Sequence, residues 1–283
     1  MKFGAVLPQL EINAQDIRTY LTEVEAMGFD YLVAFDHVVG VSREIIGSGR
    51  YALDDQFHEV LTLFAYAAAI THKLEFSTSV LILPERQAAL VAKQAAQIDV
   101  FSNGRLRLGI GIGWNQIEMQ ALGQAFKNRA RRVEEQIAVM RALWTQEEVT
   151  FNGKYHTLNR VGLNPMPVQR PIPIWFGGSA DGALERMARL GDGWMPNPGS
   201  PDEVREHIAK LHGYLEANGR DPKTFGLDAR LRLPQGTPDD WRRLIDGWRE
   251  VGATHISANT MEAGYTLDAH LSALRQFIET ARG

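Results

Sequence analysis

Short apolar runs alternate with longer segments of helical periodicity from one end of the chain to the other. Apolar runs that predict β-strands lie at 2–7, 31–35, 74–81, 105–111, 172–176, 193–195, 225–231 and 254–258. Between them, apolar side chains spaced three and four residues apart predict amphipathic helices at 14–27, 59–71, 88–101, 128–144, 180–190, from 200, from 237 and at 267–281. Eight consecutive strand–helix units predict an α/β protein built as a TIM barrel.

Three connecting segments are longer than a barrel requires. They lie at 37–56 and 112–127, after the second and fourth strands, and at 147–170, before the fifth. The third contains a predicted β-hairpin that turns at Asn152 and Gly153. We therefore expect one barrel domain over residues 1–283 with these insertions. A doubly wound sheet is the alternative, but such folds usually have fewer strands and carry a glycine loop directly after the first strand.

Composition narrows the class of protein. The 283 residues include 45% hydrophobic and 23% charged residues, carry a formal net charge of −4 and lack cysteine. No basic tract indicates binding to nucleic acid or to an anionic membrane, and disulfides and thiolate metal sites are excluded. The longest apolar segment, 60–70, is shorter than the roughly 20 residues of a membrane span. Because a strand begins at the N-terminus, we expect no signal peptide and a soluble, cytoplasmic protein.

Glycines alternate along the fourth predicted strand, at Gly109, Gly111 and Gly113. Alternate residues of a strand share one face, so the glycines remove side chains from one face of this strand. Glycine inside a strand usually marks close approach by another backbone or by a ligand. Two interpretations stay open here: relief of crowding inside a filled barrel, or one wall of a ligand-binding cleft.

Asp36 and His37 directly follow the second predicted strand, at the face where barrel active sites form. The histidine can exchange a proton with a substrate or with a ring nitrogen. The alternative is structural: Asp36 caps the following loop and His37 bonds a buried carbonyl. A metal site is disfavoured because no second ligand follows His37 at helical spacing.

The ends of the third and fourth strands carry further candidates. Ser79 can hydrogen-bond a heterocyclic ligand, and Val80 can support the face of its ring. After the alternating glycines, Trp114 can wall a planar ligand and Glu118 can act as an acid or a base. The plainer alternatives are a β-branched strand that runs into a turn, a tryptophan that covers the barrel core, and an exposed loop charge.

Gly177, Gly178 and Ser179 connect the fifth predicted strand to a helix. The N–H groups and the positive dipole end at a helix N-terminus bind anions, and glycines permit close backbone approach, so this segment predicts a phosphate site. An ordinary helix cap would account for Ser179 but does not need two preceding glycines. Trp194, at the end of the sixth strand, is a candidate for lining the same pocket or for core packing.

Taken together, these segments resemble the bacterial luciferase-like superfamily, whose members use FMN or the deazaflavin coenzyme F420. The matching stretches occur in the family's order within about residues 1–200. They are FDH at 35–37, TSVLILP at 78–84, AKQAAQID at 92–99, SNGRLRLGIGIGW at 102–114, RALW at 141–144, FNGKY at 151–155, PIWFGGS at 173–179 and GDGW at 191–194. The chain is most similar to the F420-dependent luciferase-like oxidoreductases.

The resemblance implies a flavin-like ring at the C-terminal face of the barrel, with the cofactor phosphate at 177–179. It also implies a non-prolyl cis peptide bond between Ser79 and Val80, a homodimer, and a separate enzyme that supplies the reduced cofactor. We expect His37 and Glu118 to be catalytic. The expected cofactor-binding residues are Asp36, Ser79, Val80, Gly111, Gly113, Trp114, Gly177, Gly178, Ser179 and Trp194.

Two positions bear on the choice of cofactor. Ile112 stands where luciferase-type FMN binders often carry an arginine for the phosphate, and Trp114 stands where some F420 dehydrogenases carry a glutamate. The first difference weakens the FMN assignment, and the second weakens a sugar-phosphate or alcohol dehydrogenase assignment. The missing arginine favours F420 over FMN, whereas Trp114 departs from some F420 enzymes.

We therefore expect an oxidoreductase that uses reduced F420 or FMN on a small organic substrate. Hydride transfer is expected with F420, and monooxygenation with FMN. A non-catalytic flavin- or F420-binding protein is one alternative, and a phosphate-binding barrel isomerase or aldolase is another. The latter needs a lysine or paired carboxylates at the strand ends, and no predicted strand ends in lysine.

Overall fold

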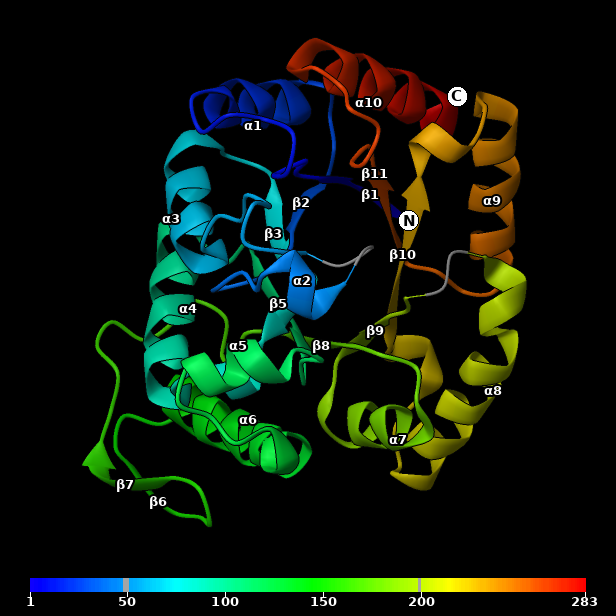
Figure 1. Ribbon diagram of the computed structural model, residues 1–283. Helices are drawn as coiled ribbons and strands as arrows, with labels where there is room; N and C mark the ends of the chain where they lie inside the picture. The colour runs from blue at the N-terminus through cyan, green and yellow to red at the C-terminus, as the bar shows by residue number, and fades with distance from the viewer. Residues whose placement is uncertain (48–50, 198–199) are drawn as a thin grey trace.

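A closed barrel of parallel strands forms the centre of the molecule (Figure 1). The computed structural model describes residues 1–47, 51–197 and 200–283. Hydrogen bonds join the strands in the order β3–β2–β1–β11–β10–β9–β8–β5–β4, and β5 closes the ring by pairing with β3. The strands are β1 (Lys2–Val6), β2 (Tyr31–Ala34), β3 (Glu75–Thr78), β4 (Leu81–Ile82), β5 (Leu106–Gly111), β8 (Ile174–Gly177), β9 (Gly193–Met195), β10 (Gly226–Arg232) and β11 (His255–Asn259).

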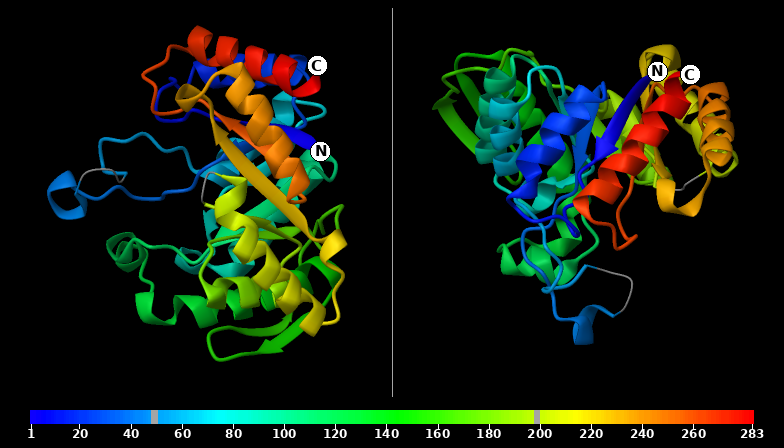
Figure 2. Two further views of the ribbon diagram at one scale, coloured as in Figure 1. Left: turned by 90° about the vertical axis from the view of Figure 1, so that its right-hand side faces the viewer. Right: turned by 90° about the horizontal axis from the view of Figure 1, so that it is seen from above.

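Helices surround the barrel and cover the outside of its strands (Figures 1 and 2). The predicted TIM barrel is confirmed, and the predicted element ends shift by only one or two residues. One strand prediction was wrong: 74–81 is not continuous, because the chain leaves the strand conformation at Ser79 and Val80, between β3 and β4. The helices that follow the strands are α1 (Asp16–Ala26), α3 (Val60–Ile70), α4 (Ala88–Ser102), α6 (Arg129–Thr145), α7 (Asp181–Leu190), α8 (Pro201–Ala217), α9 (Pro238–Glu250) and α10 (Leu267–Arg282).

Two of the predicted insertions project from the same side of the barrel (Figure 2). The insertion after β2 contains the short helix α2 (Arg43–Ile46), and its positions 48–50 lie outside the described residues. The insertion after β5 contains α5 (Gln116–Ala121). Both follow the C-terminal ends of their strands, so they border the face where barrel sites form.

The third insertion contains the predicted hairpin, built from β6 (Val149–Asn152) and β7 (Thr157–Val161). Its turn is wider than predicted, because Asn152 still pairs with Thr157 and the loop spans 153–156. The carboxylate of Glu135 on α6 accepts hydrogen bonds of 2.6–2.8 Å from three backbone amides of this loop. These long-range bonds stabilise a four-residue turn in place of the two-residue turn that Asn-Gly favours.

Large side chains fill the N-terminal end of the barrel. Tyr31 and Trp175 are buried there, and glycines face their rings. A Cβ at Gly4 would lie 2.4 Å from the Tyr31 ring, and a Cβ at Gly193 or Gly226 would lie within 2.3 Å of the Trp175 ring. These glycines make room for the two rings, so this end of the barrel is packed solid.

The guanidinium of Arg107 lies between the two rings, 4.9 Å from the centre of Tyr31 and 4.1 Å from that of Trp175. Its Nη2 donates to Asp228 at 2.9 Å, and the Tyr31 hydroxyl donates to the other oxygen of Asp228 at 2.7 Å. The buried charges are therefore paired and hydrogen-bonded, as a barrel interior requires. Within the described ranges, no helix is both long enough and apolar enough to cross a bilayer.

We expect Gly226→Ala to lower the free energy of unfolding by about 1–3 kcal/mol, because the new Cβ would lie 2.1 Å from Cη2 of Trp175. In a Trp175→Phe background the shorter ring vacates that space, so the cost of the alanine should fall by more than half. Gly213→Ala in α8, where a Cβ would meet nothing within 4 Å, is the control and should be neutral or stabilising. Equal costs of Gly226→Ala in both backgrounds, measured by urea unfolding, would contradict this account.

Candidate functional site

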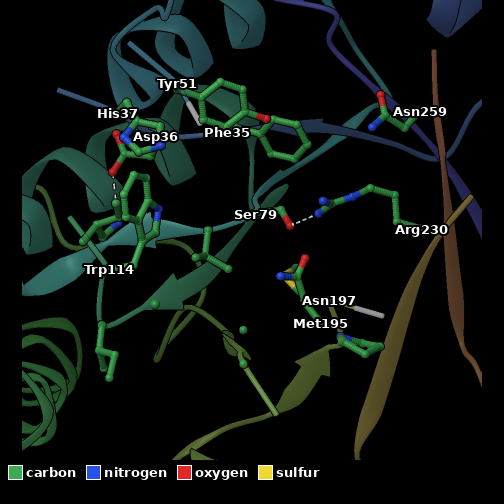
Figure 3. A pocket seen from close by; sticks show the side chains of 18 of the residues that line it. Phe35, Asp36, His37, Tyr51, Ser79, Trp114, Met195, Asn197, Arg230 and Asn259 are labelled. Carbon is green, nitrogen blue, oxygen red and sulfur yellow. Dashed lines mark hydrogen bonds between the residues drawn. The ribbon is translucent and has the colours of Figure 1, made fainter. Parts of the chain in front are cut away.

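A cavity of about 410 Å³ opens at the C-terminal ends of the barrel strands. Nine of the twelve residues predicted from the sequence line it, from the ends of β2, β3, β4, β5 and β8. They are Asp36, His37, Ser79, Val80, Gly111, Gly113, Trp114, Gly177 and Gly178. The structure thus gathers into one cavity segments that are far apart in the sequence (Figure 3).

The other three predicted residues lie next to the cavity but do not line it. Glu118 is fully buried behind His37. Trp194 is also fully buried, and its Nε1 donates to the carbonyl of Gly178 at 2.7 Å. Ser179 follows Gly178 and is half-buried. These three side chains support the wall of the cavity from behind or beside it.

Glu118 holds His37 in place. Oε2 of Glu118 lies 2.9 Å from Nδ1 of His37, and Oε1 accepts from the amides of Val38 at 2.6 Å and Val39 at 3.3 Å. Asn115 caps α5 and accepts hydrogen bonds from its first-turn amides, which fixes the helix that carries Glu118. One carboxylate therefore joins the two insertion loops.

The protonation state of this pair follows from its contacts. Burial raises the pKa of Glu118, but the hydrogen bond to His37 and the bonds from two backbone amides outweigh burial and leave the pKa below its usual value. An ionised Glu118 favours the tautomer of His37 with the proton on Nδ1. Nε2 of His37 has no hydrogen-bond partner among the described residues, so it is the nitrogen that can exchange a proton with a ligand.

Asp36 is a second buried carboxylate behind the cavity wall. Its oxygens accept from Arg86 at 2.6 Å and from the amide of Ile82 at 3.0 Å, and Arg86 also pairs with Glu59 at 2.8 Å. Burial raises the pKa of Asp36, and Arg86 opposes that shift. Both of its oxygens are thus used to tie β2 to β4, although the residue borders the cavity.

The peptide bond between Ser79 and Val80 is cis. The Val80 side chain lies between two of the predicted glycines: a Cβ at Gly111 would come within 2.5 Å of it, and a Cβ at Gly177 within 2.9 Å. Gly111 and Gly177 therefore make room for Val80 and also expose backbone to the cavity.

The other two glycines of the alternating set, Gly109 and Gly113, meet different structural constraints. A Cβ at Gly109 would meet the Thr78 carbonyl oxygen at 2.1 Å, so relief of crowding accounts for this glycine. Gly113 has a φ of +77°, a left-handed conformation that glycine adopts readily, and it lies beyond the end of β5. Relief of crowding is therefore confirmed at Gly109, whereas Gly111 and Gly113 line the cavity and their role in binding a ligand stays a prediction.

The segment 177–179 has the features of an anion site. Gly178 has a φ of +99° and is exposed, and the Oγ of Ser179 is buried without a hydrogen-bond partner among the described residues. No side chain caps the N-terminus of α7, which leaves its first N–H groups for another acceptor. Asp181 in the first turn is paired with Lys210 at 3.0 Å. An orphaned hydroxyl and an uncapped helix fit a phosphate group.

Residues that were not predicted from the sequence form the opposite wall of the cavity (Figure 3). They come from the ends of β9, β10 and β11 and are mostly polar: Asn197, Arg230, Arg232, Asn259 and Glu262. The spacing of Arg230 and Arg232 was a usable signal, because two charges at alternate positions near the C-terminal end of a predicted strand lie on one face at the catalytic rim. The predicted strand ended at 231, which left Arg232 outside it.

Glu85 is a buried carboxyl that follows β4, on the side of the cavity that Asp36 and Glu118 support. Burial, together with the negative charges of Glu118 and Asp36, raises its pKa to about 8 against the effect of Arg86. Neither of its oxygens has a hydrogen-bond partner among the described residues.

We expect Glu85 to give the stability a downward slope as pH rises from 5 to 8, because the folded chain then holds a proton on Glu85 that the unfolded chain, with a pKa near 4.5, has lost. Glu85→Gln cannot ionise and removes this slope. After allowance for solvent screening, its stability relative to the wild type should rise by about 2 kcal/mol across this range. Glu185→Gln, at an exposed position on α7, is the control. Parallel pH profiles for Glu85→Gln and the wild type in urea unfolding would refute the assignment.

Known proteins match this chain in sequence and in fold. The sequence profile described as luciferase-like monooxygenase matches residues 1–256. An uncharacterized protein of Mycobacterium tuberculosis H37Rv is 38% identical over 201 residues, which cover 71% of this chain and 68% of that protein. An FMNH2-dependent dimethylsulfone monooxygenase of Pseudomonas putida is 32% identical over 250 residues, which cover 86% of this chain and 65% of the relative.

Solved structures share the fold at lower sequence identity. The monooxygenase RslO1 of Streptomyces bottropensis has a TM-score of 0.83 at 21% identity, with 99% of this chain and 98% of that chain covered. An F420-dependent secondary alcohol dehydrogenase, solved with an F420–acetone adduct, has a TM-score of 0.83 at 18% identity, with 100% and 99% covered. By the sequence match across residues 1–256, supported by these relatives, the chain belongs to the luciferase-like monooxygenase family.

Proposed function

We propose that this chain is an oxidoreductase that uses reduced F420 or FMN to reduce or oxygenate a small organic substrate. One observation carries the proposal: a single cavity lies between Gly177 and Gly178, which precede the uncapped N-terminus of α7, and a histidine backed by a buried carboxylate. Ser79 and Val80 border the space between them. A phosphate-bearing planar cofactor needs this combination of an anion site, an open backbone wall and a proton-exchanging group.

Each part of the site has a separate task in this proposal. The segment 177–179 holds the phosphate, and Val80 with its flanking glycines supports the ring. His37 donates or accepts a proton through Nε2, while Glu118 sets its tautomer and orientation. When bound, reduced F420 supplies a hydride, whereas reduced FMN supplies electrons to oxygen.

One lining residue favours F420 over FMN. Ile112 borders the cavity at the position where the family resemblance predicts a phosphate-binding arginine in FMN enzymes, and it offers no charge. Trp114 borders the cavity beside His37, with ring centres 6.2 Å apart. Relatives include an FMNH2-dependent enzyme and an F420-dependent one, so both cofactors belong in the test.

An aldolase or isomerase is less well supported. A Schiff-base aldolase requires a lysine in the cavity, and the described lining residues include none. A non-catalytic cofactor carrier would bind the same ligands without turnover, so a turnover assay separates that alternative from an enzyme.

We expect titration with the protein to change the fluorescence of F420 or FMN at micromolar concentrations. The buried Ser179 hydroxyl has no other partner, so Ser179→Ala should weaken phosphate binding about tenfold or more. Riboflavin, which lacks the phosphate, should bind wild type and variant alike. Ser200→Ala removes the cap of α8 away from the cavity and is the control. Absence of binding to both cofactors would overturn the proposed function.

We expect Glu118→Gln to lower turnover by about 10²–10⁴-fold, because the substitution disturbs the proton on His37. The dissociation constant of the cofactor should change less than about threefold, because the proposed phosphate-binding segment 177–179 is unchanged. The assays follow oxidation of reduced F420, and consumption of the organic compound with reduced FMN and oxygen, over a panel of small organic compounds that includes charged and neutral ones. Glu135→Gln breaks a comparable glutamate–histidine contact, 2.8 Å from His156 in the hairpin, and should not affect turnover. Unchanged turnover in Glu118→Gln would remove this pair from the mechanism.

A further inference from the structure

The two walls of the cavity differ in character. Glycines and Val80 from β4, β5 and β8 form one wall, and polar side chains from β9, β10 and β11 form the other. A cofactor whose phosphate binds at 177–179 would lie against the first wall. The polar wall is then free to contact a second molecule.

Most charged groups that line the cavity already have an opposite charge beside them. Asp36 pairs with Arg86 at 2.6 Å, and Arg232 pairs with Glu262 at 3.0 Å. Arg230 differs: it forms no ion pair with any described residue. The Asp228 carboxylate, two residues earlier on β10, is already taken by Arg107 and Tyr31.

The surroundings of Arg230 leave part of its guanidinium free. Nη2 donates to the hydroxyl of Ser79 (Figure 3), and the guanidinium lies 4.6 Å from the centre of the Phe35 ring. Nε is buried without a partner among the described residues, and Nη1 donates to none of them. Burial lowers the pKa of Arg230. The Asp228 carboxylate opposes this shift, but no described residue forms an ion pair with the guanidinium, so an anion in the cavity would offset the cost of removing a cation from water.

We infer that Arg230 binds the carboxylate of an organic acid substrate and so determines the substrate class of this site. The planar fork of arginine matches the geometry of a carboxylate, and Asn259 borders the same wall with a side-chain NH2 that has no partner among the described residues. The inference rests on the proposed function, because it assigns the first wall to the cofactor.

The test measures binding of benzoate and of its neutral analogue benzamide to the whole chain by calorimetry, without cofactor. The wild type should bind benzoate at least tenfold more tightly than benzamide. Arg230→Gln should remove this preference, and Arg230→Lys should keep part of it, because the charge remains while the fork is lost. Arg242→Gln on α9 is the control and should lose less than threefold, since Arg242 does not line the cavity and pairs with Asp239 at 3.0 Å.

Several results would overturn the inference. Equal binding of benzoate and benzamide by the wild type is one, and equal losses in Arg230→Gln and Arg242→Gln are another. A third is a loss of affinity for reduced FMN or F420 in Arg230→Gln with benzoate unaffected, which would assign Arg230 to the cofactor ring. If Arg230→Gln does not fold, the preference of the wild type for benzoate over benzamide and the reduced preference of Arg230→Lys still test the inference. Benzoate binding is measured without cofactor. If the protein binds neither F420 nor FMN, the proposed function fails, but the benzoate result still tests the role of Arg230.

Discussion

The candidate site depends on the position of one side chain, Val80, between two glycines. Its methyl groups lie within 2.5 and 2.9 Å of the places where Cβ atoms at Gly111 and Gly177 would be. The ends of β4, β5 and β8 can therefore approach one another, and backbone rather than side chains faces the cavity on this side. A side chain at either glycine would push Val80 into the cavity or separate the strands, because a packed interior has little free volume.

Two buried carboxylates hold the rest of the site against this wall. Glu118 connects the loop after β5 to His37 and to two amides of the loop after β2. Asp36 connects the end of β2 to Arg86 and to the backbone of β4. Each of these carboxylates fixes a loop through hydrogen bonds to a charged acceptor, and such bonds are stronger than bonds between neutral groups. The histidine is thereby fixed from behind while its other nitrogen stays available to a ligand.

Strand β10 shows how the barrel separates structural charge from functional charge. Asp228, Arg230 and Arg232 lie at alternate positions, so they share one face of the strand. Asp228 is neutralised at the closed N-terminal end by Arg107, and Arg232 is paired with Glu262 at the rim. Arg230, between them, lies at the cavity without an ion-pair partner among the described residues. The cavity therefore has a positive group on the wall opposite the backbone cradle.

The sequence by itself determined the barrel and most of one cavity wall. Hydrophobic periodicity is a local property, so it located the barrel helices and all strands but 74–81 to within one or two residues, and the glycine and Gly-Gly-Ser segments carried their own local signals. It did not determine which alternating glycine makes room for which neighbour, that Trp194 supports Gly178 from behind, or that Arg230 reaches Ser79 across the barrel. Those contacts join residues 16 to 151 positions apart. Only closure of the barrel brings such residues together, because strand pairing and shared burial, not local propensity, decide what lies opposite each side chain.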